Sequence, residues 1–315
     1  MLVLWAVVPP LLLLVYYYRR VPAAPPLPRL LLFFVVGAIS GFVALALEWS
    51  FEYLVSWVVD WERITRSLPG VALRQIVEVG PIEEGSKLGG VVLFQSLKIQ
   101  LRPTRPSTVF FFTIAVALGF AAEENWVYLA NGTASILDRL IGTPVHVLFS
   151  APWGYALGVA SCSRFRSGSD KGVVARALVN AIACHALVNI LSSAWRYPEP
   201  LLFLSYGLFP FLLWMFWRME GLLRQVQRKP LIALISGVKP IYRYWQLGLA
   251  VFAFALGGNA IFGLFLLTKS LSLSPSQLFY ANVWWFLGSR LLLNLIPALL
   301  AWGIYRYLRH SAGRQ

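Results

Sequence analysis

The sequence predicts an all-α fold, that of a polytopic helical membrane protein with about nine transmembrane helices. Hydrophobic residues make up 58% of the chain and charged residues only 13%, with a mean hydropathy of +0.68. Soluble domains average about 25% charged residues. Apolar runs of about 18 or more residues follow one another, and each is long enough to cross a bilayer. The ten-residue alternation that is typical of transmembrane barrel strands does not occur in the sequence.

The predicted spans succeed one another along the whole chain. They cover residues 2–18, 30–57, 71–97, 107–130, 140–163, 173–196, 200–217, 247–268 and 277–305. The first span is not a cleaved signal peptide, because Arg19 and Arg20 follow its apolar stretch instead of preceding it. The longest internal loop, residues 218–246, is basic and separates the first seven spans from the last two.

The excess of basic residues fits this topology. The formal net charge is +14, and in a soluble protein such a charge would suggest binding to nucleic acid. Most of the Lys and Arg residues instead lie in alternate loops, after the first, third, fifth, seventh and ninth spans. Because basic loops stay on the cytoplasmic side, we expect the N-terminus outside, the C-terminus in the cytoplasm and no nucleic-acid partner. Cys162 and Cys184 form no disulfide framework and no CxxC metal motif.

Two pairs of glycines have a spacing that permits close approach of helices. Gly37 and Gly41 lie in the second span, and Gly154 and Gly158 lie in the fifth. Small residues four positions apart remove side-chain bulk from one helix face. We therefore expect these faces to be packing contacts.

Four consecutive spans, the third to the sixth, carry polar residues that a simple membrane anchor would avoid. These residues are Glu83, Glu84 and Lys87 in the third span, Glu123, Glu124 and Asn125 in the fourth, His146 and Ser150 in the fifth, and His185 and Asn189 in the sixth. An ionised side chain at the bilayer centre costs about 2.5–3.5 kcal/mol on insertion scales. Such a concentration therefore needs a purpose, and we interpret it as a reaction centre.

Spacing and depth place these residues together. Glu83 and Lys87 are four residues apart, as are the polar residues of the fifth and of the sixth span, so each pair shares one helix face. At 1.5 Å per residue, Glu83, Glu124, His146 and His185 lie roughly 18–25 Å from the cytoplasmic ends of their spans. All four therefore fall in one layer in the outer half of the membrane. Pro81 is expected to kink the third span beside this layer.

These residue types suit hydrolysis by activated water. A carboxylate in a poorly solvated site becomes a stronger base, and His185 and Asn189 can donate hydrogen bonds to a developing oxyanion. Alternatively, Glu and His side chains can bind a zinc ion that activates the water. The HExxH and GxSxG motifs are absent from the sequence, so a thermolysin-type zinc site and a serine-hydrolase elbow are excluded.

Four short motifs resemble those of PrsW-type intramembrane proteases. They are EEGSK at residues 83–87, FAAEEN with Phe120, Glu124 and Asn125, HVLFS around His146, and HALVN at residues 185–189. They occur in the order seen in that family, which is related to the CAAX prenyl endopeptidases and bacteriocin-immunity-type membrane proteins. The similarity covers roughly residues 75–195 and leaves the first two and the last three spans outside.

The resemblance implies a peptidase of a bacterial plasma membrane that cuts single-span or otherwise membrane-anchored proteins. It implies a four-helix catalytic core at residues 71–196, flanked by helices of residues 1–70 and of residues 197–315. Carried over, Glu83 is the base and His185 and Asn189 are the oxyanion donors. The full expected catalytic set is Glu83, Glu84, Glu124, His146, His185 and Asn189, supported by Lys87, Phe120, Asn125 and Ser150. A metal-free glutamate mechanism and a zinc site of Glu84, Glu124, His146 and His185 both fit this pattern.

Other functions can use the same residues. Buried Glu, His and Lys side chains form relays in proton- or cation-coupled transporters and channels, although the inverted repeats of many transporters are not evident in this sequence. An inactive relative could act as a membrane binding or immunity module. Glu83 and Lys87 alone could also form a buried ion pair that fixes helix packing.

Overall fold

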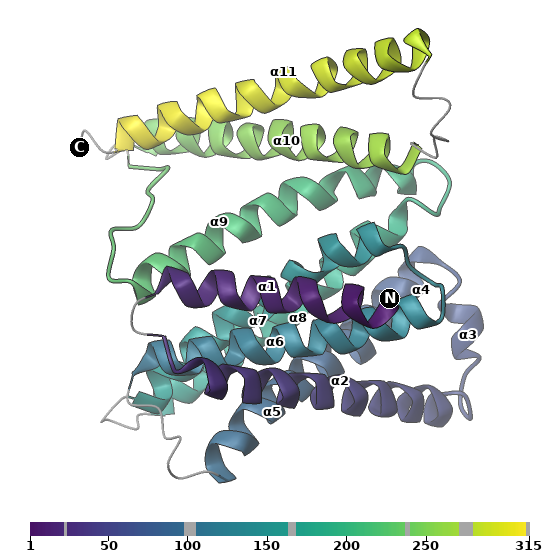
Figure 1. Ribbon diagram of the computed structural model, residues 1–315, viewed down its shortest axis with the longest axis vertical. Helices are drawn as coiled ribbons and strands as arrows, with labels where there is room; N and C mark the ends of the chain where they lie inside the picture. The colour runs from purple at the N-terminus through teal and green to yellow at the C-terminus, as the bar shows by residue number, and fades with distance from the viewer. Residues whose placement is uncertain (22–23, 98–104, 163–167, 237–239, 271–279, 313–315) are drawn as a thin grey trace. The chain divides into compact units, whose positions relative to one another are not determined.

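The computed structural model describes residues 1–21, 24–97, 105–162, 168–236, 240–270 and 280–312, which are helical with short connections and contain no strand (Figure 1). The prediction of an all-α fold is confirmed. The elements are α1 Leu2–Arg20, α2 Leu27–Val55, α3 Trp61–Ile64, α4 Leu68–Arg74, η1 Gln75–Val79, α5 Gly80–Leu97, α6 Pro106–Ala130, α7 Ile136–Cys162, α8 Gly168–Ala194, η3 Leu201–Gly207, α9 Leu208–Val226, α10 Pro240–Ser270 and α11 Ala281–Ala312.

Seven of the helices in these ranges are long and apolar enough to cross a membrane. They correspond to seven of the nine predicted spans. The prediction of a polytopic helical membrane protein is therefore confirmed. The two predicted spans that do not meet this criterion contain α5 and α7, which carry half of the charged and polar residues noted above. The other half lies on α6 and α8, which meet the criterion.

The chain divides into two compact units, of which the first comprises residues 1–190 and 222–229. Its central helix is α6, which packs against α1, α2, α5 and α7 (Figure 1). Every residue from Val109 to Glu123 on α6 is buried. A helix that is apolar on all sides belongs in the interior of a helical bundle, and here it forms the core around which the other helices lie.

Both expected glycine faces pack against α6. A Cβ atom at Gly37 of α2 would collide with the backbone of Val116, and one at Gly158 of α7 would collide with the backbone of Pro106. Gly119 of α6 in turn lies against the backbone of Phe34. These glycines let the backbones of α2, α6 and α7 approach closely, and thereby fix the spacing of the helices that carry the polar residues.

The third predicted span is irregular in its N-terminal part. The π-helical segment η1 directly precedes Gly80 and Pro81, and the Gly80 N–H donates to the carbonyl of Gln75, five residues back. Proline removes a helical hydrogen bond and crowds the preceding turn, and a wider π turn relieves that crowding. Glu78 in this segment is fully buried and accepts hydrogen bonds from Trp61 Nε1 (2.9 Å) and Arg74 Nε (3.3 Å).

The second unit comprises residues 191–221 and 230–315, in which α10 and α11 run side by side (Figure 1). The predicted loop 218–246 is partly helical, because α9 continues to Val226, with residues 222–226 belonging to the first unit, and α10 begins at Pro240. The sequence predicts a loop from residue 218 onward because charged residues interrupt the apolar run there. Met215, Met219 and Leu223, however, are buried at four-residue spacing, so the helix continues as an amphipathic one.

Candidate active site

The polar cluster is centred on Lys87, whose side chain is fully buried. Its ammonium donates to Glu84 Oε1 (2.7 Å), to Glu83 Oε2 (3.3 Å) and to His146 Nδ1 (3.3 Å). The nitrogen also lies 4.1 Å from the centre of the Phe120 ring, within range of a cation–π contact. An ammonium has three hydrogens and no acceptor, so each hydrogen has one partner.

Glu84 is held rigidly by three donors. Besides Lys87, it accepts hydrogen bonds at Oε2 from Ser150 Oγ and from Trp153 Nε1, both at 2.9 Å. The Glu84 side chain is fully buried. A carboxylate with this many donors is a fixed anchor between α5 and α7.

Glu83 is bonded much more weakly. Its hydrogen bond from Lys87 is long, at 3.3 Å, and its Oε2 atom lies 4.0 Å from His146 Nδ1 and 3.9 Å from His185 Nε2. The residue is 7% exposed. Glu83 Oε2 thus faces an ammonium and two imidazoles without a short bond to any of them.

His146 links Lys87 to Glu124. Because the ammonium can only donate, His146 Nδ1 accepts, and Nε2 carries the ring hydrogen that points at Glu124 Oε2, 2.6 Å away; this tautomer is assigned from the hydrogen-bond network. Glu124 Oε2 also accepts from Arg139 Nη2 at 2.7 Å. Arg139 Nε donates to Asn125 Oδ1, again at 2.7 Å. One chain of polar contacts therefore joins α5, α6 and α7.

Asn125 supports this chain without facing Lys87. Its amide nitrogen donates to Thr143 Oγ1 (2.9 Å) and to the carbonyl of Ala6 (3.3 Å). The side chain is 1% exposed. Asn125 therefore ties α6 to α1 and α7 and holds Arg139 in place.

The two polar residues of α8 have different surroundings. His185 stacks on Phe149, with 4.4 Å between ring centres, and its buried Nδ1 atom has no hydrogen-bond partner, lying 3.5 Å from Glu84 Oε1. Asn189, half-buried and one turn further along, donates from its amide to Gln75 Oε1 at 2.8 Å. Asn189 is thus oriented by the π-helical segment that precedes α5.

The structure therefore brings most of the expected residues together around Lys87. Asn125 and Asn189 lie beside this group, with partners of their own. The residues not anticipated from the sequence are Gln75, Arg139, Phe149 and Trp153. A signal for two of them existed, because Arg139, Thr143, His146, Ser150 and Trp153 follow one another at alternating spacings of four and three, which is one face of α7.

The carboxylate and imidazole groups of the cluster are not arranged to bind a metal ion. In the described part of the chain, no group of three or more His, Cys, Asp or Glu side chains is placed to hold one. Glu84 Oε1 and His146 Nδ1 face the Lys87 ammonium, and Glu124 Oε2 is taken by His146 and Arg139. The suggested zinc ligands Glu84, Glu124, His146 and His185 therefore do not converge on a common point while Lys87 occupies the centre.

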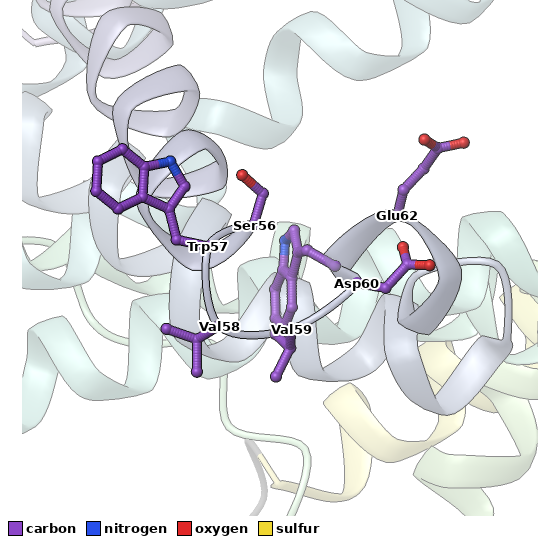
Figure 2. A pocket seen from close by; sticks show the side chains of 7 residues that line it. Ser56, Trp57, Val58, Val59, Asp60 and Glu62 are labelled. Atoms are coloured by element: carbon purple, nitrogen blue, oxygen red, sulfur yellow. The ribbon is translucent and has the colours of Figure 1, made fainter.

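A pocket elsewhere in the first unit involves none of these residues. It lies at the connection between α2 and α3 and is lined by residues 56–62, among them Trp57 and Asp60 (Figure 2). Trp57 is 73% exposed. An exposed tryptophan at the end of a membrane span is typical of the interface between lipid and water, so this hollow carries no argument for catalysis.

Comparisons with known proteins agree with the four motifs. A family model described as "PrsW family intramembrane metalloprotease" matches residues 25–215. The protein named "Protease PrsW" from Shouchella clausii (strain KSM-K16) is 25% identical over 158 residues, which is 48% of this chain and 69% of that protein. No solved structure matches the chain. The matched range extends beyond residues 75–195 and includes α2 and the beginning of α9.

Proposed function

The chain belongs to the PrsW family of intramembrane metalloproteases, and on that premise we propose that its polar cluster cleaves peptide bonds with a water molecule activated by Glu83. As a member of this family it is an integral membrane protease with a protein substrate. The proposal concerns which residues do the chemistry and how.

The observation that carries the proposal is the difference between the carboxylates. Glu84 accepts from Lys87, Ser150 and Trp153, and Glu124 is engaged by His146 at 2.6 Å and Arg139 at 2.7 Å. Glu83 Oε2 has only a long bond from Lys87. A general base must have a lone pair free for the water proton, and of these three glutamates Glu83 is the least engaged by donors.

The proposed reaction conserves protons. Glu83 accepts a proton from water as the water oxygen adds to the carbonyl carbon of the substrate. The carbonyl oxygen becomes negative and receives hydrogen bonds from His185 and Asn189, which act as oxyanion donors. When the tetrahedral intermediate collapses, Glu83 passes its proton to the leaving amine. None of these steps uses a metal ion, because the donors as arranged do not fit one.

The other charged residues have positioning roles. The Lys87 ammonium stabilises the negative charges of Glu83 and Glu84 on the same helix, where buried carboxylates without a cation would be costly. Glu124 fixes the ring of His146, and Arg139 fixes Glu124. The cluster is thereby preorganised before substrate binds.

The substrate and topology follow from the membrane setting. We propose that the substrates are single-span or membrane-anchored proteins and that the site lies in the outer half of a bacterial plasma membrane. The N-terminus lies outside and the C-terminus in the cytoplasm, in keeping with the distribution of basic loops. The catalytic core is formed by residues 71–196, with the flanking helices supporting it.

The test is cleavage of tagged single-span substrates by purified protein in nanodiscs. Glu83→Gln should lower the cleavage rate by ~100-fold or more, since it removes the base. His185→Ala should also lower the rate, because it removes an oxyanion donor. Glu123→Gln is the matched control, because Glu123 is a 7% exposed carboxylate on α6, whereas the hydrogen bonds of Lys87 go to Glu83, Glu84 and His146. Equal cleavage by wild type and Glu83→Gln would reject the role of Glu83, and proton flux in liposomes that depends on Glu83 would favour a transporter.

A further inference from the structure

We propose that the ammonium of Lys87 is the resident cation of this site and holds the place that a metal ion takes in a metalloprotease. The inference deepens the proposed function and rests on it for the cleavage measurements alone. It concerns the identity of the cation, which the family description leaves to a metal.

The first support is the set of atoms around the ammonium. Two carboxylate oxygens, from Glu83 and Glu84, and one imidazole nitrogen, from His146, converge on Lys87 Nζ. These are the atom types that zinc takes in catalytic sites. The distances of 2.7–3.3 Å are those of hydrogen bonds, whereas zinc lies about 2.0–2.2 Å from such ligands. The spacing of these three atoms therefore matches an ammonium and not a zinc ion.

The second support is the arrangement behind His146. In metal sites the ligating imidazole almost always donates its other ring N–H to a carboxylate or carbonyl. Here His146 turns Nδ1 to Lys87 and Nε2 to Glu124, at 3.3 and 2.6 Å. The order carboxylate, histidine, cation is that of a metal centre, with the ammonium in the position of the metal.

The third support is that the ammonium and the two carboxylates are side chains of the same helix. Lys87 lies three and four residues after Glu84 and Glu83 on α5, so the stem of the side chain places the ammonium between both carboxylates. Phe120 covers another side of it at 4.1 Å. Unlike a metal ion, this cation cannot dissociate, and a chelator cannot remove it.

For catalysis, the ammonium of Lys87 and the carboxylate of Glu83 then have different roles. An ammonium supplies positive charge and hydrogen bonds, but it is no Lewis acid and does not generate a bound hydroxide. Activation of water then depends on the Glu83 carboxylate, which lies 3.3 Å from the ammonium nitrogen.

The experiment measures zinc in purified protein, with no need of a substrate. Wild type in nanodiscs is equilibrated with zinc, desalted and assayed by elemental analysis. We expect far less than one zinc per chain and the same unfolding temperature with and without zinc or chelator. About one zinc per chain in wild type, lost in His146→Ala, would overturn the inference.

A variant gives the converse measurement. Lys87→Ala removes the ammonium and leaves the donors of Glu84 and His146 around an open position. We expect zinc to bind this variant and to raise its unfolding temperature, and the double variant Lys87→Ala/His146→Ala to lose that response. A folded Lys87→Ala that ignores zinc would contradict the inference, and if the variant does not fold, the wild-type measurement still decides.

Cleavage assays separate this inference from the proposed function. Zinc-free wild type that cleaves with full activity in chelator supports both. If wild type is zinc-free and Glu83→Gln cleaves normally, the role of Glu83 fails while the assignment of Lys87 stands. If wild type contains zinc that a chelator removes together with activity, the assignment of Lys87 fails while the chain remains a peptidase.

Discussion

Lys87 of the first unit and Arg290 of the second are both basic residues within predicted membrane spans, and their surroundings are opposite. Lys87 is fully buried, with three acceptors and an aromatic ring around its nitrogen. Arg290 is exposed on α11, where the Phe286 ring lies 5.5 Å from its guanidinium carbon. A charge in a membrane helix is therefore not by itself a mark of a site. The groups that surround the charged atom decide whether the residue belongs to a site.

The largest expected difference between the two residues is in stability. Lys87→Met leaves two carboxylates without their shared cation inside the bundle, and breaking a buried pair costs about 3–5 kcal/mol. Arg290→Met should change the free energy of unfolding by no more than about 0.5 kcal/mol, as is usual for exposed positions. Thermal unfolding of both variants in nanodiscs measures the difference. Similar unfolding temperatures would show that the buried network around Lys87 contributes little.

Arg139 is an intermediate case, because it lies at the rim of the cluster with a side chain that is 13% exposed. Arg139→Gln removes the hydrogen bond to Glu124 Oε2 and loosens the Glu124–His146 pair. We expect cleavage to fall by roughly 10- to 100-fold, the range typical of residues that orient the ligands of a site. Arg66→Gln is the control, since the side chain of Arg66 is 73% exposed and forms an ion pair with the exposed Glu62. A loss no greater than that of the control would remove Arg139 from the site.

Arg139 also shows where prediction from sequence stops. The motifs on four successive helices placed Glu83, Glu124, His146 and His185 in one layer, because helix rise and periodicity are regular. The predicted fifth span begins at residue 140 and so excludes Arg139, because a charge before an apolar run looks like a boundary, whereas α7 begins at Ile136 and includes it. Helices that continue past the apolar stretch, as α9 does to Val226, are invisible to hydropathy for the same reason.

Trp153 and Gln75 were missed for different reasons. Hydropathy treats tryptophan as apolar, so the indole N–H that binds Glu84 has no weight in it. Gln75 is the first residue of the π-helical segment, where an extra residue in the turn changes which face later residues occupy. Patterns based on 3.6 residues per turn cannot align Gln75 with Asn189, which lies 114 positions later in the chain. Such contacts come from tertiary packing alone.

The smallest effect is expected from Gln75, whose contact to Asn189 involves no charge. Gln75→Leu removes the acceptor at 2.8 Å that orients the Asn189 amide, so kcat should fall by about tenfold, less than the ~100-fold loss typical of deleting an oxyanion donor outright. KM should stay unchanged, because the interaction strengthens only in the transition state. Gln75→Glu keeps an acceptor at the same place and should retain most of the activity, which a purely structural contact would not require. If Gln75→Leu raises KM and leaves kcat intact, Asn189 serves substrate binding and does not stabilise the oxyanion. Of the two proposed oxyanion donors, His185 alone would then remain.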